Sequence, residues 1–339
     1  MEEAVAENGA GEPVRTDSSC WTRADFGESR SWARRLKPEM LKEIDAAIVG
    51  AVRRGLDFSN LSPKDFPLPQ TSTLLLDWLS DLESGRGVTV IEGFPAENYS
   101  VEENFLAHAG ISSYLGTIVA QNHLGEKIIE IVDRDEPYSH KSRGYHSREL
   151  LPFHTDGADW AGLLCIGTAE EGGLSVISSS ASVHNAILSE RPDLYEVLLR
   201  GFFHHRRGEQ TAGEPPVSSE RIPVFSFYNG LLHTTYNRNP IDWVVHEGIE
   251  LSSLEVEALD FFDSVVARPD LQIQMELRKG DIQYINNFSI LHSRGSYRDT
   301  LEERRHLLRI WLNYSNARRV GPTLLDLYAP EEIDKRRDL

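Results

Sequence analysis

Two histidines and one aspartate in this chain have the residue types and spacing of a metal site. His154 and Asp156 form a His-x-Asp pair, and His292 lies far downstream. Two imidazoles and one carboxylate bind Fe(II) on one face and leave the opposite coordination positions open. Arg305 follows His292, and a guanidinium can hold a carboxylate through two parallel hydrogen bonds. Together these residues predict a non-haem iron site beside a binding site for an organic acid.

The His-x-Asp pair alone is weak evidence for a metal. The chain has 12 histidines, and only His154 is followed by aspartate at the second position. A buried His154 that hydrogen-bonds to a neighbouring carboxylate would give the same pattern without a metal. The pattern gains weight because short apolar segments and a Gly-Gly turn follow it, and because His292 and Arg305 come later in the chain.

The spacing of these residues suits β-strands. Alternate side chains of a strand share one face, so we expect His154 and Asp156 to point at one metal while Thr155 points away. By the same rule, Arg305 and Arg309 should reach into one cavity.

Four polar residues are further candidates for the site. Arg309 could anchor an anionic substrate group. Gln121 and Asn122 end a predicted strand and could line the substrate pocket. Asn287 is expected to hold the local backbone or a ligand carboxylate.

Apolar periodicity predicts helices before strands. Three helices are expected in the first part of the chain, one from Pro38 to the stop at Gly55, one over 71–82 and one over 101–115. A helical stretch over 182–200 should break at Arg191-Pro192, and Ser252 and Glu255 form a predicted capping box. The predicted strands cover 88–91, 118–120, 128–132, 163–167, 172–178, 271–277, 282–286 and 307–314. This order predicts a mostly β protein with flanking helices and a sandwich or barrel core.

One large domain is expected. Residues 1–22 are polar, without a periodic apolar face, and predict a disordered tail. Residues 23–339 form the predicted domain, with an N-terminal helical part over about 37–115 and a long polar loop over about 206–220.

Composition excludes several classes of protein. The 339 residues carry a net charge of −18, which disfavours a nucleic-acid partner. There is no run of 18 apolar residues and no signal-peptide pattern at the N-terminus, so we expect no membrane partner and a cytoplasmic location. Gly-x-Gly-x-x-Gly, P-loop and Gly-x-Ser-x-Gly motifs are absent. The expected partner is a small molecule, and a homo-oligomer remains open.

From about residue 91 to 312 the chain resembles the taurine dioxygenase and clavaminate-synthase-like group of Fe(II)- and 2-oxoglutarate-dependent oxygenases. The matching residues are His154-Thr155-Asp156, Gly172-Gly173-Leu174-Ser175, Gly280-Asp281, Asn286-Asn287, His292 and Arg305-x-x-x-Arg309. The resemblance implies a double-stranded β-helix, also called a jelly roll, with the metal at its open end. The first 90 residues and the 206–220 loop fall outside the pattern.

The resemblance also implies roles for individual residues. His154, Asp156 and His292 correspond to the iron ligands, and Arg305 to the residue that binds the far carboxylate of 2-oxoglutarate. Ser175 stands where the group has a hydroxyl that helps to hold this carboxylate. O2 is the second co-substrate, and succinate and CO2 are released. Halogenating relatives lack the ligand carboxylate, so Asp156 favours hydroxylation, desaturation or ring closure.

Three hypotheses remain open at this point. The first is an oxygenase of a small, carboxylate-bearing metabolite such as an amino acid. The second is an oxygenase of a peptide or protein side chain. The third is a non-catalytic jelly-roll binding module with an incidental His-x-Asp pair.

Overall fold

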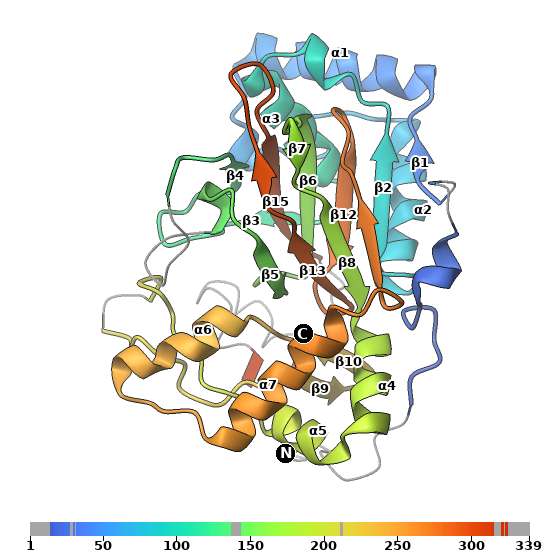
Figure 1. Cartoon of the computed structure of the whole chain (residues 1–339). Coiled ribbons are helices and arrows are strands. Elements are labelled where there is room, and N and C mark those ends of the chain that lie inside the picture. The colour runs from blue at the N-terminus through green and yellow to red at the C-terminus, as the bar shows by residue number, and fades with distance from the viewer. Residues whose placement is uncertain are drawn as a thin grey trace, which may run out of the picture.

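The computed structural model describes residues 14–27, 30, 32–136, 144–210, 213–314, 320–321 and 323–324. Two β-sheets form the centre of this part of the chain (Figure 1). The larger sheet has the order β1-β2-β12-β6-β15-β3, and β4 also pairs with β15. Its strands are β1 (Arg34–Arg35), β2 (Val88–Glu92), β3 (Thr117–Val119), β4 (Ile128–Ile131), β6 (Trp160–Gly167), β12 (Ile282–Asn286) and β15 (His306–Asn313).

The smaller sheet has the order β11-β8-β13-β5. Its strands are β5 (Leu151–His154), β8 (Ser175–Ser179), β11 (Gln272–Met275) and β13 (Ile290–Arg294). Apolar side chains from both sheets meet in one buried cluster, for example Val90 and Leu307 of the larger sheet with Ile177 and Ile290 of the smaller. The two sheets therefore face each other across a shared core, as the predicted sandwich requires.

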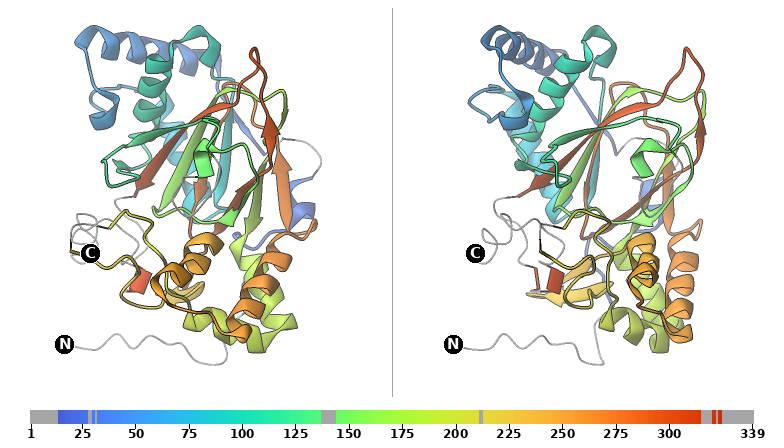
Figure 2. Two further views of the ribbon diagram at one scale, coloured as in Figure 1. Left: turned by 60° about the vertical axis from the view of Figure 1, so that its left-hand side comes forward. Right: turned by 90° about the vertical axis from the view of Figure 1, so that its left-hand side faces the viewer.

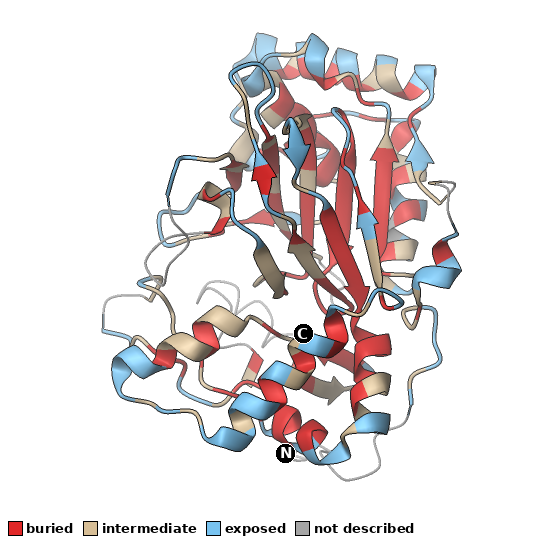
Figure 3. Cartoon of the chain, in the orientation of Figure 1, coloured by how far each residue is buried: buried red, intermediate tan, exposed pale blue. Residues whose placement is uncertain are grey.

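Three helices cover the other face of the larger sheet. They are α1 (Pro38–Arg54), α2 (Thr71–Glu83) and α3 (Val101–Ser112). Their buried residues pack with Leu164, Tyr284 and Leu308 of the sheet. The outward faces of α1 and α2 are exposed, whereas α3 is buried over most of its length (Figure 3). The predicted stop at Gly55 is confirmed, because Gly55 caps α1 in the left-handed conformation.

A second helical group packs beyond the end of the smaller sheet (Figure 2). It comprises α4 (Ser180–Glu190), α5 (Pro192–Arg200), α6 (Arg238–Asp242) and α7 (Ser253–Val266), with the hairpin β9 (Phe225–Tyr228) and β10 (Leu231–Thr234). The predicted break at Pro192 separates α4 from α5, since proline has no N–H to continue a helix. The predicted capping box of Ser252 and Glu255 is present at α7.

Two features differ from the sequence-based expectations. The disordered tail was predicted to extend to residue 22, but Trp21 is only 2% exposed and its indole N–H donates to the Arg86 carbonyl. Burial of this one large apolar ring outweighs the polar character of the residues around it. The hairpin of β9 and β10 was not predicted, although its Asn229-Gly230 turn is a hairpin signal. Within the described residues, no helix is long and apolar enough to cross a membrane.

Candidate metal centre

His154 and His292, from two strands of the smaller sheet, come together with Asp156. Each offers one ligand atom, and these atoms lie within 4.8 Å of one another. The Nε2 atom of His154 is 4.0 Å from Asp156 Oδ1, and the Nε2 atom of His292 is 3.7 Å from Asp156 Oδ2. The side chain of Asp156 is only 7% exposed. A small ion placed among these atoms would touch two nitrogens and one oxygen.

Strand pairing brings the two histidines together. His154 on β5 and His292 on β13 are direct partners in the antiparallel register. The expectation that Asp156 lies in the same strand is wrong, because β5 ends at His154. A backbone bond from Thr155 N–H to the Tyr236 carbonyl, 2.8 Å long, draws the chain away from the sheet instead. His292 is the central residue of β13.

The ligand atoms have the protonation that a metal needs. The Nδ1 atom of His154 lies 2.8 Å from the Pro152 carbonyl, which can only accept, so Nε2 keeps its lone pair. The pKa of His292 is lowered to about 3, mainly by burial and secondly by the proximity of His154. Among the described residues, buried Asp156 Oδ2 has no hydrogen-bond partner. A metal ion would satisfy this oxygen, so the donor set fits Fe(II).

Arg309 and Gln121 form a pair beside the triad. Arg309 Nη1 is 3.3 Å from Asp156 Oδ1, and its Nε donates to Gln121 Oε1 at 2.7 Å. Gln121 in turn donates to the Arg309 carbonyl at 2.9 Å. Burial opposes ionisation of Asp156, but the charge of Arg309, together with the two adjacent histidines, outweighs it and lowers the pKa of Asp156 to about 2. Asp156 is therefore a carboxylate at neutral pH.

Asn122 does not join this group. Its Oδ1 accepts from Leu124 N–H and Glu126 N–H, and its Nδ2 donates to the Glu126 carboxylate. The side chain thus closes the turn between β3 and β4. The strand that was expected to end at residues 121–122 already ends at Val119.

Asn287 holds the backbone next to Asp156. Its Oδ1 accepts from Asp156 N–H at 3.2 Å, and its Nδ2 donates to the Ala158 carbonyl at 2.9 Å. Its own N–H donates to the Asp159 carbonyl. The predicted contact with local backbone is present in the structure.

Arg305 is buried in the interior between the sheets, 7% exposed. Its Nη1 has no hydrogen-bond partner among the described residues. Burial, followed by the charge of Arg294, lowers the pKa of Arg305 to about 10, so it stays a cation at neutral pH. A buried, incompletely paired guanidinium fits the carboxylate of 2-oxoglutarate. Ser175 is also buried, but its hydroxyl donates to Gln283 Oε1 at 3.1 Å.

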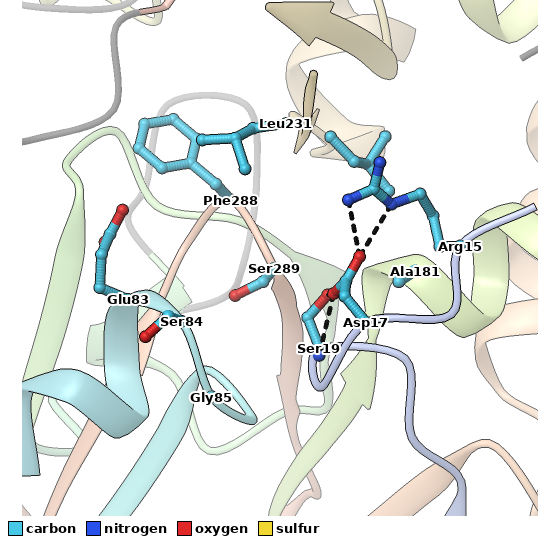
Figure 4. A pocket seen from close by; sticks show the side chains of 11 residues that line it. Arg15, Asp17, Ser19, Glu83, Ser84, Gly85, Ala181, Leu231, Phe288 and Ser289 are labelled. Carbon is cyan, nitrogen blue, oxygen red and sulfur yellow. Dashed lines mark hydrogen bonds and ion pairs between the residues drawn. The ribbon is translucent and has the colours of Figure 1, made fainter. Parts of the chain in front are cut away.

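One cavity beside the N-terminal segment does not contain the triad. It has a volume of about 200 Å³ and is lined by Arg15, Glu83 and Phe288, among others (Figure 4). Arg15 is paired there with Asp17. Phe288 also lines a second, smaller cavity, which adjoins Asp156. None of the predicted site residues lines the larger cavity, so this cavity lies outside the predicted site.

Comparisons with known proteins agree with this geometry. Residues 54–311 match the model of the taurine catabolism dioxygenase TauD, TfdA family. The chain is 34% identical to the FR-33289 synthase of Streptomyces rubellomurinus over 317 residues, which are 91% of this chain and 93% of that protein. The family model covers residues 54–311, so residues 54–90 and the 206–220 loop lie inside the family match although they were placed outside the sequence pattern; residues 1–53 lie outside the family model as well.

Solved structures share the fold at low identity. One is an asparagine oxygenase in complex with Fe(II), 2S,3S-3-hydroxyasparagine and succinate, with a TM-score of 0.64 and 12% identity, covering 84% of this chain and 94% of that chain. Another is the non-haem iron oxygenase OrfP in complex with Fe and α-ketoglutaric acid, with a TM-score of 0.62 and 15% identity, covering 83% and 94%. The chain belongs to the TauD and TfdA family of Fe(II)- and 2-oxoglutarate-dependent dioxygenases.

Proposed function

We propose that His154, Asp156 and His292 bind Fe(II) and that Arg305 binds the far carboxylate of 2-oxoglutarate. The observation that carries the proposal is the convergence of these three ligands around a buried carboxylate oxygen without a partner among the described residues. We further propose that the two facing sheets are a double-stranded β-helix with this site between them.

Bound iron and 2-oxoglutarate supply the oxidising chemistry that uses O2 and releases succinate and CO2. The residues of the chain prepare this site. Burial keeps both imidazoles neutral, and the proximity of His154 adds to this effect at His292, so no proton has to leave before a metal binds. Arg309 keeps Asp156 ionised. Arg305 adds a fixed positive charge in an interior that excludes water, where charge-assisted hydrogen bonds are strong.

The proposed substrate is a small molecule with an anionic group, such as an amino acid. Arg309 supports this proposal because it lies at the triad and its guanidinium is held between the rings of Tyr145 and Trp311, 5.3 and 5.0 Å away. The relatives support it too, since one is an oxygenase of asparagine. Gln121 would act through Arg309, by fixing its orientation, rather than on the substrate directly.

The test is anaerobic addition of Fe(II) and 2-oxoglutarate to the purified protein. A weak visible charge-transfer band should appear in the wild type and be lost in His154→Ala and Asp156→Ala. Persistence of the band in these variants would refute the ligand assignment. A substrate screen read by succinate formation, followed by product mass, then separates hydroxylation, which adds one oxygen, from desaturation or ring closure, which removes two hydrogens.

A peptide or protein side chain is the second candidate substrate. Succinate release that responds to the small-molecule pool of a cell, and not to its protein fraction, would count against it. A non-catalytic module would show neither Fe(II) uptake nor 2-oxoglutarate binding.

A further inference from the structure

Tyr297 places a second polar group next to Arg305 in the buried interior. Tyr297 is 6% exposed, and its hydroxyl has no hydrogen-bond partner among the described residues. The Cζ atom of Arg305 is 5.2 Å from the centroid of the Tyr297 ring, and that of Arg294 is 5.0 Å from it. Two guanidinium groups therefore adjoin one phenol ring.

The backbone fixes this arrangement. Tyr297 belongs to the short strand β14 (Tyr297–Arg298), which pairs with β7 (Glu171–Gly172). Gly173, the residue that follows β7, has φ +70°. A Cβ atom at this position would lie 3.0 Å from Arg305 Cδ and Nε and 3.3 Å from Tyr297 Cβ. A glycine at this position thus leaves room for both side chains to pack against the same turn.

Arg294 approaches the ring from the smaller sheet. It lies two residues after His292 and pairs in register with Ser175. Its guanidinium donates to the Gly144 and Glu149 carbonyls. After burial, the charge of Arg294 is the next cause of the lowered pKa of Arg305.

The buried Tyr297 hydroxyl and the two guanidinium groups together favour the binding of an anion. A buried hydroxyl without a partner costs free energy, and two neighbouring guanidinium charges repel each other at low dielectric. A carboxylate removes both costs, because its two oxygens accept several hydrogen bonds and its charge offsets the repulsion. Ser175 is less suited to donate to this carboxylate, because its hydroxyl already donates to Gln283 Oε1.

We propose that Tyr297 is a further co-substrate-binding residue, whose hydroxyl donates to the same far carboxylate of 2-oxoglutarate that Arg305 Nη1 binds. This inference rests on the proposed role of Arg305. It assigns Tyr297 to the selection of a keto acid with a second carboxylate over one without.

Tyr297→Phe tests the inference, because it removes one oxygen atom and keeps the ring between the arginines. The dissociation constant of 2-oxoglutarate is measured anaerobically on the Fe(II) protein from the charge-transfer band, together with the dissociation constant of 2-oxobutyrate, which lacks the far carboxylate. We expect 2-oxoglutarate to bind about 10-fold to 100-fold more weakly. Binding of 2-oxobutyrate and Fe(II) affinity should stay unchanged, and the melting temperature should not fall, because the removed hydroxyl has no hydrogen-bond partner among the described residues.

Tyr284→Phe is the matched control. Tyr284 is also a fully buried tyrosine, but its hydroxyl is bonded to Ser112 at 2.8 Å on the helix-covered face of the larger sheet. This variant should lower the melting temperature and leave 2-oxoglutarate binding unchanged. Wild-type affinity for 2-oxoglutarate in Tyr297→Phe, or an equal loss for both keto acids, would overturn the inference. If the wild-type protein itself shows no 2-oxoglutarate binding, the proposed function fails instead.

Discussion

His154 and His292 face each other across the β5–β13 strand pair, with their ring centroids 4.2 Å apart. Burial disfavours the charged form of both imidazoles, and the proximity of His154 disfavours the charged form of His292 further. Both therefore have a lowered pKa. The same strand pair that brings the two ligands together also keeps them in the neutral form that binds a metal.

Metal binding should stabilise the folded protein through these two residues. At a free Fe(II) concentration about 100 times the dissociation constant, the gain is about 2.7 kcal/mol. We expect the melting temperature to rise by roughly 3–5 °C under anaerobic conditions. The rise should disappear with a chelator and in His292→Ala. A similar rise in His292→Ala would show that the metal binds elsewhere.

Asn287→Ala should weaken iron binding more than it weakens the fold. The substitution removes the acceptor for Asp156 N–H and the donor to the Ala158 carbonyl. We expect Fe(II) affinity to fall roughly 10-fold to 100-fold, with about 1–3 kcal/mol of lost stability. Metal titration and urea unfolding measure the two effects separately.

Asn313→Ala is the control for this prediction. Asn313 Oδ1 accepts from the N–H of Asp159, which follows the candidate ligand Asp156 in the same loop. It should lose comparable stability and retain more of the iron affinity. Equal losses of iron affinity in the two variants would contradict a specific role for Asn287.

Gly173→Ala should impair 2-oxoglutarate binding. The left-handed backbone costs about 1–2 kcal/mol for an alanine, and the new Cβ would press on Arg305 Cδ and Nε. Gly230→Ala has a similar φ, +74°, but its Cβ would meet nothing within 4 Å. Both variants should lose stability, and only Gly173→Ala should bind 2-oxoglutarate more weakly. Anaerobic titration compares them, and equal binding would show that the turn does not control Arg305.

His108 should make the fold sensitive to acid. It lies on α3, fully buried against the larger sheet, and burial lowers its pKa to about 4. Between pH 6.5 and 4 the unfolded chain takes up this proton and the folded chain does not, so stability falls as the pH falls. The loss between pH 6.5 and 5 is roughly 2 kcal/mol.

His108→Gln should remove this part of the pH dependence. Urea unfolding at pH 7 and at pH 5 measures the difference in both proteins. The variant should lose less stability than the wild type on acidification. An identical pH dependence would mean that other buried histidines account for the effect.

Local sequence was sufficient for much of the fold. The limits of α1 follow from Pro38 at its start and Gly55 at its end, because these residues act on backbone they adjoin. The break between α4 and α5 follows from Pro192 for the same reason. The types of the candidate iron ligands and the Arg305-x-x-x-Arg309 spacing could also be recognised, since they depend only on residue identity and position in the sequence.

Only the tertiary structure decided how these residues meet. The pairing of β5 with β13 joins His154 to His292, and no local periodicity encodes a contact between strands so far apart in sequence. Gln121 was predicted to line the substrate pocket, and its hydrogen bond to Arg309, 188 residues away in the sequence, depends on long-range packing. The position of Tyr297 beside Arg305 depends in the same way on the short β7–β14 pair. The sequence determined which groups the site contains, and the folding of distant segments onto one another determined which of them are close enough to act together.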